Sequence, residues 1–86
     1  MNFTTLIRLA VRSILTQNGP LSCSDVVQKM GLDPRNCKRT VHAIMVEMEE
    51  EGVISAERDR NGRRTEWFIY DYQIRKRDRL LASFIA

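Results

Sequence analysis

Cysteine and long apolar runs are scarce in this sequence, and each scarcity excludes a class of protein. The two cysteines, Cys23 and Cys37, are too few for a disulfide scaffold and lack the paired spacing of a zinc site. Near the N-terminus, apolar residues alternate with polar and basic ones, which is not the pattern of a signal peptide or a membrane span. We therefore expect a cytoplasmic protein, in a reducing compartment, that makes no membrane contact.

Patterns of catalytic residues are missing as well. No Ser-His-Asp spacing, paired catalytic carboxylates or phosphate-binding glycine loop occurs, and His42 is the only histidine. Cys23, Cys37 and His42 lack the local pairing of metal ligands, so we expect no metal, no cofactor and no enzyme activity. Redox control through the two cysteines stays open, because Cys37 lies near a predicted helix N-terminus, although its side chain falls on an apolar stripe.

The composition itself is that of one small globular domain. The sequence has 86 residues, of which 43% are hydrophobic and 29% are charged, and this is sufficient for one modest core. The net charge of +3 and the isoelectric point of about 9.2 favour an anionic partner only weakly. Whether the partner is anionic therefore has to be judged from where the basic residues lie in the sequence.

Residues 33–52 have the pattern of one helix with both ends marked. Asp33 is a favourable N-cap, Pro34 suits the first helical position, and Gly52 suits the turn that ends a helix. One side of the helix has the spacing of a buried stripe. This stripe comprises Cys37, Val41, Ile44, Met45 and Met48. The outer side carries Arg35, Asn36, Arg39, His42, Ala43 and Val46, with Lys38 and Thr40 at its flanks.

The charges of this helix are sorted along its length. Its basic residues lie in the first half, whereas the end carries Glu47, Glu49, Glu50 and Glu51. Acidic residues at a helix C-terminus oppose the helix dipole, so helix stability alone does not favour this order. A helix that presents only its N-terminal half to a polyanion can carry acidic residues at its C-terminal end. We interpret the sorting as an indication of nucleic-acid binding.

Two shorter helices are expected before residue 33. Thr4 or Thr5 can cap the first, and residues 18–20 end it. Its apolar face comprises Phe3, Ile7, Ala10, Val11, Ile14 and Leu15. Ser22 and Asp25 form a capping pattern for a brief second helix that ends at Gly31. The buried side of that helix comprises Val26, Val27 and Met30, and Leu32 is available to pack beneath the third helix.

After residue 52 the apolar period changes from helical to alternating, which predicts two strands. Asn61 and Gly62 between them predict a tight hairpin in which both residues adopt positive φ. The resulting partners are Asp59 with Arg64, Ala56 with Trp67, and Ile54 with Ile69. Ile54, Ala56, Trp67 and Ile69 then share the core face, while Val53, Phe68 and Tyr70 lie on a second face that needs cover.

Residues 73–86 predict a last helix with a basic first half and an apolar side. The apolar residues are Ile74, Leu81, Phe84 and Ile85. This side either covers the hairpin within one chain or forms a dimer surface. We expect a homodimer, because a small DNA-binding domain gains affinity by presenting two copies to two half-sites. The expected division is a domain over 1–72 and the additional helix over 73–86.

The order of these elements resembles the winged helix-turn-helix family of DNA-binding domains over about residues 3 to 70. The segment PLSCSDVVQKMGLDPRNCKRTVHAIMVEMEEEGVI is similar to the second helix, turn and recognition helix of the family, and RDRNGRRTEW to its wing hairpin. The resemblance implies a mostly helical α+β fold of three helices and a two-stranded wing, to which the last helix is added. It also implies that helix 34–51 enters the major groove of double-stranded DNA while the wing, residues 58–65, contacts the backbone or minor groove.

The candidate DNA-binding residues lie on these two elements, which together carry half of the 14 basic side chains. Phosphates supply most of the attraction, whereas sequence is read at base edges. Asn36 and Arg39 are the leading candidates for base contacts, because Asn pairs with adenine and Arg with guanine. Trp67 is expected to support the hairpin rather than to stack on bases. The full set is Arg35, Asn36, Lys38, Arg39, Thr40, His42, Arg58, Arg60, Asn61, Arg63 and Arg64.

We therefore expect a sequence-specific transcriptional regulator that acts as a homodimer without a small-molecule effector. Two other interpretations stay open. In the first, the chain is a winged helix adaptor that binds proteins through apolar surface, and the arginines of the hairpin are only solvated. In the second, it is an accessory DNA-binding factor of replication, of a plasmid or of a phage. The division between charged and apolar surface distinguishes the adaptor from the two DNA-binding interpretations.

Overall fold

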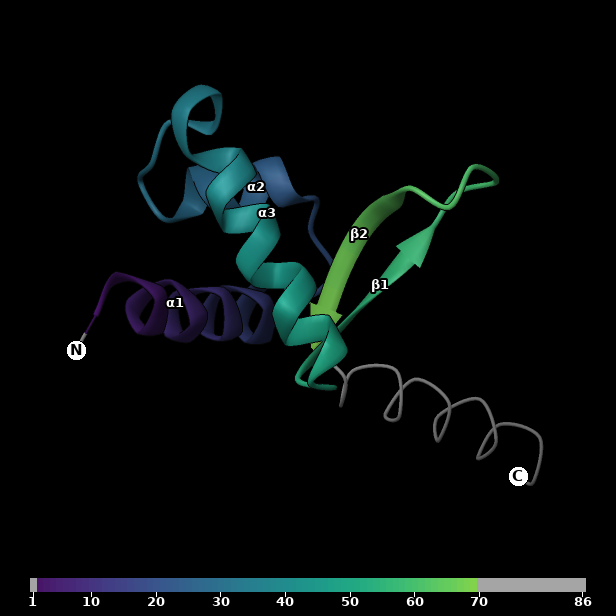
Figure 1. Ribbon diagram of the computed structural model, residues 1–86, viewed down its shortest axis with the longest axis horizontal. Coiled ribbons are helices and arrows are strands. Elements are labelled where there is room, and N and C mark those ends of the chain that lie inside the picture. The colour runs from purple at the N-terminus through teal and green to yellow at the C-terminus, as the bar shows by residue number, and fades with distance from the viewer. Residues whose placement is uncertain (1, 70–86) are drawn as a thin grey trace.

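The computed structural model describes residues 2–69 as three helices followed by a two-stranded antiparallel hairpin (Figure 1). The helices are α1 (Phe3–Asn18), α2 (Cys23–Lys29) and α3 (Pro34–Glu50), and the strands are β1 (Ile54–Arg58) and β2 (Arg64–Ile69). The fold of this part is a small, mostly helical α+β domain, which confirms the expected α+β class with three helices and a two-stranded hairpin. The predicted last helix, with Ile74, Leu81, Phe84 and Ile85, lies outside the described residues.

The ends of the helices follow from local hydrogen bonds. Asp33 Oδ1 accepts from the Arg35 N–H at 3.0 Å, and Ser22 Oγ accepts from the Asp25 N–H at 3.2 Å, so both predicted N-caps are confirmed. The N-cap prediction for α1 was wrong. Asn2 caps this helix by accepting from the Thr5 N–H at 2.8 Å, because its carboxamide oxygen reaches the first free donors before Thr4 or Thr5 can.

The C-terminus of α3 ends in a paired hydrogen-bond turn around Gly52. The Gly52 N–H donates to Glu49 O and the Val53 N–H donates to Met48 O, both at 3.0 Å. Gly52 has φ +79°, the left-handed conformation that such a turn requires. The same pattern follows α2, where Met30 is the C-cap and Gly31 comes next. These turns set the direction in which the chain leaves each helix.

The core lies where the three helices meet the inner face of the hairpin. Trp67, Val11, Val26, Val41 and Met45 are fully buried at its centre. Burial of one such apolar side chain contributes roughly 1.5–3 kcal/mol. The remaining members of the core cluster are Ile7, Leu15, Cys23, Val27, Ile44, Met48 and Ile54. The predicted buried sides of all three helices are therefore largely correct.

Two apolar residues lie where the sequence did not place them. Phe3 was expected on the buried face of α1, yet it is 57% exposed, because the first turn of α1 extends beyond the rest of the domain (Figure 1). Val46 was expected on the outer side of α3, and it is half-buried and packs against the core. The stripe that α3 buries is thus wider than its sequence pattern indicates, and α1 buries less than predicted.

The strand register is as predicted along most of the hairpin. Ile54 lies opposite Ile69, Ala56 opposite Trp67, and Glu57 opposite Glu66. Leu21, in the link between α1 and α2, forms an isolated antiparallel bridge to Trp67, with N–H to O distances of 2.9 and 2.7 Å. This bridge ties the hairpin to the helical layer. Phe68 lies on the second face and is 3% exposed, so that face is covered at this residue.

The hairpin turn differs from the prediction. The register shifts between Glu57 and Arg58, so that Arg58 rather than Asp59 lies opposite Arg64. Asp59 Oδ1 accepts from the N–H groups of Asn61 and Arg63, each at 2.9 Å, and the Gly62 N–H donates to Asp59 O at 3.0 Å. Gly62 alone in the turn has positive φ. The carboxylate of Asp59 therefore stabilises a longer turn than the expected two-residue primed turn.

No helix among residues 2–69 combines the length and the hydropathy that crossing a bilayer requires.

Candidate nucleic-acid interface

The first two turns of α3 present a row of polar and basic side chains to solvent. Pro34 occupies the first helical position and Asp33 caps the helix, so the backbone there is held from its first residue. Asn36 Nδ2 donates to Asp33 Oδ2 at 3.2 Å, which leaves its carbonyl oxygen and its second N–H available. The exposed residues in these turns are Arg35, Asn36, Lys38, Arg39 and Thr40, all of them candidates from the sequence.

His42 was also predicted on the outer side of α3, but it is only half-exposed. Its ring lies edge-on to the Trp67 ring, with centroids 5.7 Å apart and an interplanar angle of 86°. Burial, and then the nearby charges of Arg64 and Lys38, hold the pKa of His42 below its ordinary value of 6.5. His42 is therefore favoured in its neutral form and packs against the hairpin instead of standing free.

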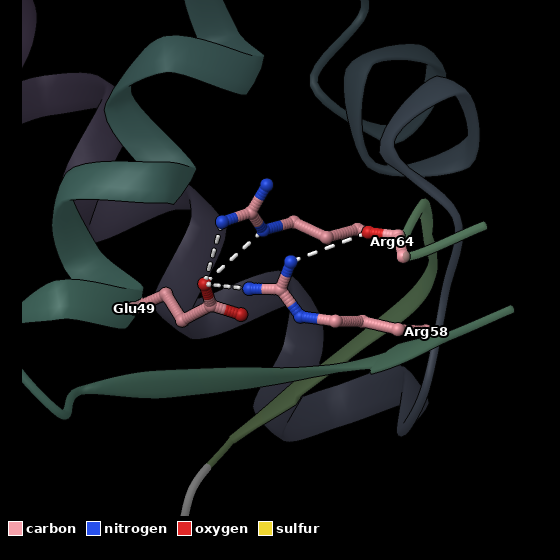
Figure 2. A network of polar contacts seen from close by, with 4 residues as sticks. Glu49, Arg58 and Arg64 are labelled. Carbon is pink, nitrogen blue, oxygen red and sulfur yellow. Dashed lines mark hydrogen bonds and ion pairs between the residues drawn. The ribbon is translucent and has the colours of Figure 1, made fainter. Parts of the chain in front are cut away.

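The basic residues of the hairpin divide into two groups. Arg60 and Arg63 lie at the tip with Asn61 and are exposed. Within residues 2–69, no ion pair or hydrogen bond engages either of these two guanidinium groups. Arg58 and Arg64 lie at the ends of the strands and turn back towards α3 (Figure 2). Of the four arginines that the sequence groups together, two are thus paired with a carboxylate and two are exposed without one among residues 2–69.

Arg58 and Arg64 both bind one carboxylate oxygen of Glu49. Oε1 of Glu49, in the last turn of α3, accepts from Arg58 Nη2 at 3.1 Å, from Arg64 Nε at 3.1 Å and from Arg64 Nη2 at 2.9 Å (Figure 2). The side chains of Glu49 and Arg64 are 17% and 22% exposed, whereas that of Arg58 is 46% exposed. The Glu49–Arg64 pair is therefore screened by salt less than an ordinary surface pair.

Arg64 extends this contact into the core. Its guanidinium carbon lies 5.6 Å from the centroid of the Trp67 ring, a cation–π distance. Trp67 in turn meets His42, so a continuous chain of contacts runs from Glu49 through Arg64 and Trp67 to His42. Both ends of this chain are on α3 and its middle is on β2. The chain fixes the position of the hairpin relative to the exposed half of α3.

The exposed half of α3 and the tip of the hairpin both lie in the upper part of the view in Figure 1. In Figure 1, α3 descends from the top of the view, and the hairpin tip projects at the upper right. α1 crosses the lower part of the view, next to the C-terminal half of α3. The two elements that carry the predicted basic residues are therefore both in the upper part of this view, away from α1.

The glutamates at the end of α3 have partners that sequence reasoning did not find. Glu49 binds Arg58 and Arg64, and Glu51 forms an ion pair with Arg8 of α1. These contacts offset the unfavourable position of acidic residues at a helix C-terminus. For the contacts of Glu49, the only signal in the sequence was the number of arginines in the hairpin. That number does not show which arginines bind α3.

The two cysteines differ in burial. Cys23 is buried, and burial raises the pKa of its thiol. Its sulfur lies 4.0 Å from Lys38 O, a contact between α2 and α3. Cys37 is a free, half-buried thiol. Among residues 2–69, no three His, Cys, Asp or Glu side chains are grouped as metal ligands.

No known family model, curated protein sequence or solved structure matches this chain.

Proposed function

We propose that this protein is a winged helix DNA-binding protein that acts as a sequence-specific transcriptional regulator. The exposed N-terminal half of α3 enters the major groove of double-stranded DNA. The hairpin tip acts as the wing and contacts the adjacent backbone or minor groove. Asn36 and Arg39 read base edges, while Arg35, Lys38, Arg60 and Arg63 bind phosphates.

One observation carries the proposal: the first turns of α3 and the hairpin tip, both of which carry solvent-exposed cations, lie in the same upper part of the view, away from α1 (Figure 1). A duplex can approach both elements without meeting the glutamates in the last turn of α3, of which Glu49 and Glu51 are already paired with arginines. The resemblance to the winged helix-turn-helix family and the order of elements support the same assignment.

The proposal includes a homodimer formed by the last helix, as expected from the apolar residues of 73–86. Two recognition helices then read two half-sites whose spacing is set by the dimer. Regulation follows from occupancy of the site or from contact with polymerase.

The test is binding to a mixed-sequence duplex about two helical turns long, measured by fluorescence anisotropy at several salt concentrations. Replacing Arg60 and Arg63 by Ala removes phosphate contacts, so the slope of log affinity against log salt should fall by about 0.9 unit per lost contact. Replacing Arg39 by Ala should cost about 1–3 kcal/mol on a duplex selected from a random pool and much less on unrelated duplexes.

Arg12 of α1 provides the matched control, because it is exposed and basic but lies on α1, outside the proposed interface. Arg12→Ala should leave the salt slope at the value of the unsubstituted protein. Equal slopes in all these variants would contradict the proposal.

A second candidate function is a protein-interaction adaptor of the same fold. The observation that favours it is the exposed apolar stripe of α1, where Phe3, Leu6 and Leu9 are 57%, 52% and 52% exposed. Such residues are available for a partner protein. Normal duplex affinity after loss of Arg39, Arg60 and Arg63 would favour this candidate.

A further inference from the structure

We propose that Glu49 determines DNA specificity by occupying two arginines that would otherwise bind backbone phosphates. This inference rests on the proposed DNA-binding function and adds a role for a residue that does not touch DNA. Arg58 and Arg64 lie at the base of the hairpin, and both donate to the same oxygen of Glu49.

The geometry of this contact is that of an anion site already filled. Guanidinium groups recognise carboxylates and phosphates through the same N–H donors, with similar distances. Arg64 presents Nε and Nη2 to Glu49 Oε1 at 3.1 and 2.9 Å, and Arg58 adds Nη2 at 3.1 Å. These three donors are directed at α3 and are unavailable to an approaching backbone while Glu49 is ionised.

The position of the pair favours its persistence when DNA binds. Arg64 is packed over the Trp67 ring, and its side chain is only 22% exposed, so exchanging Glu49 for a phosphate also requires leaving the ring. Arg58 is held twice, because its Nη1 also donates to Gly62 O at 3.3 Å. The cations left for the duplex are those at the hairpin tip and on the first turns of α3.

The consequence concerns specificity. Each additional phosphate contact strengthens binding to every sequence equally, whereas base contacts strengthen binding to one sequence. By keeping two cations from the DNA phosphates, Glu49 lowers the affinity for unrelated DNA. The base contacts of α3 then determine which DNA sequence is bound most tightly. Loss of this carboxylate should therefore raise affinity for unrelated DNA and lower the ratio of specific to non-specific binding.

The experiment compares Glu49→Gln with Glu50→Gln. Both changes remove one negative charge from a net charge of +3, and both sites lie in the last turn of α3, but Glu50 is exposed and pairs with no arginine among residues 2–69. Gln keeps an acceptor oxygen at position 49, which preserves the packing of the hairpin. Circular dichroism and Trp67 fluorescence verify that each variant is folded.

On a mixed-sequence duplex, Glu49→Gln should steepen the slope of log affinity against log salt by about 0.9–1.8 units, which corresponds to one or two new phosphate contacts. Glu50→Gln should keep the slope of the unsubstituted protein. Equal slopes for the two variants would overturn the role of Glu49. Failure of the unsubstituted protein to bind any duplex would instead overturn the proposed function.

Two further variants test the inference even if Glu49→Gln does not fold. With Glu49 present, Arg58→Ala should reduce the salt slope by less than half as much as Arg60→Ala, because Arg58 is directed at Glu49 and Arg60 is exposed at the tip. Equal reductions in the two variants would show that Glu49 does not restrain Arg58, and would overturn the inference.

Discussion

At the scale of single residues, Glu49 and His42 connect the two parts of the proposed interface. Glu49 holds Arg64, Arg64 lies over Trp67, and Trp67 meets His42. None of the four is fully exposed, and together they link the last turn of α3, strand β2 and the middle of α3. Changes at these residues should therefore alter how the hairpin is held as well as how charge is distributed.

The half-buried His42 predicts a pH dependence of stability. Its pKa is lowered in the fold, first by burial and then by Arg64 and Lys38, so the unfolded chain takes up a proton at a higher pH than the folded chain. The contribution of neutral His42 is fully present above a pH of about 6.5 and is lost progressively below it. The free energy of unfolding should therefore decrease as the pH falls from about 7.5 to about 5.

Urea unfolding at a series of pH values measures this decrease, and His42→Gln is the control because Gln does not titrate. The variant should show a flatter profile in this range, in which Asp and Glu remain largely ionised because their ordinary pKa values are about 4. The same decrease in His42→Gln and in the unsubstituted protein would contradict the assignment to His42.

Sequence patterns predicted residue positions well where the cause is local. Asp33 and Ser22 each cap a helix through a donor two or three residues away, and such spacing is visible in the sequence. Glu49 was not found, because its partners Arg58 and Arg64 are 9 and 15 residues distant and approach it only after the hairpin has packed on α3. The acidic end of α3 was interpreted through its repulsion of a polyanion, whereas the structure gives Glu49 and Glu51 arginine partners.

At the scale of elements, the hairpin shows how one side chain changes a turn. Alternation of apolar residues was sufficient to predict both strands and the pairing of Ala56 with Trp67. Asn61 and Gly62 indicated a primed turn, but Asp59 accepts two backbone N–H groups and stabilises a longer turn with a register shift. Sequence alone does not decide between these turns, because both place Gly62 at positive φ, and the choice depends on which N–H groups the Asp59 carboxylate reaches.

Gly62 gives a prediction for this element. Its φ is +79°, and a Cβ at this position would meet no heavy atom within 4 Å, so the cost of Gly62→Ala is one of backbone conformation alone. We expect a loss of about 1–2 kcal/mol in the free energy of unfolding.

Asn adopts positive φ more readily than Ala does, so Gly62→Asn should cost less than Gly62→Ala, and chemical denaturation of both variants measures the difference. Equal losses for the two variants would contradict the assignment of the cost to the positive φ of Gly62.

At the scale of the whole molecule, charge and apolar surface are separated. The first turns of α3 and the hairpin tip carry exposed cations, whereas α1 carries the exposed residues Phe3, Leu6 and Leu9. The sequence predicted the first surface from the positions of basic residues. It did not predict the second, because helical periodicity placed Phe3 on the buried face and cannot show where the domain ends along α1.

The proposed homodimer, based on the apolar residues of the helix predicted over 73–86, gives a prediction for the assembly. Replacing Leu81 and Phe84 together by Asp should convert a homodimer into monomers, because a charge at a buried apolar contact is costly. Sedimentation equilibrium measures the change, and Leu6→Asp on α1 is the control. Dissociation by Leu6→Asp but not by the double substitution would place the dimer contact on α1 instead.

In the proposed complex, the first turns of α3 and the hairpin tip contact the same duplex. Titrating isotope-labelled protein with a mixed-sequence duplex, while recording backbone amide resonances, tests this claim most directly. We expect the shifts to concentrate in residues 35–40 and 58–65, with the resonances of α1 almost unchanged. Shifts around Phe3, Leu6 and Leu9 that leave the hairpin tip unaffected would contradict it.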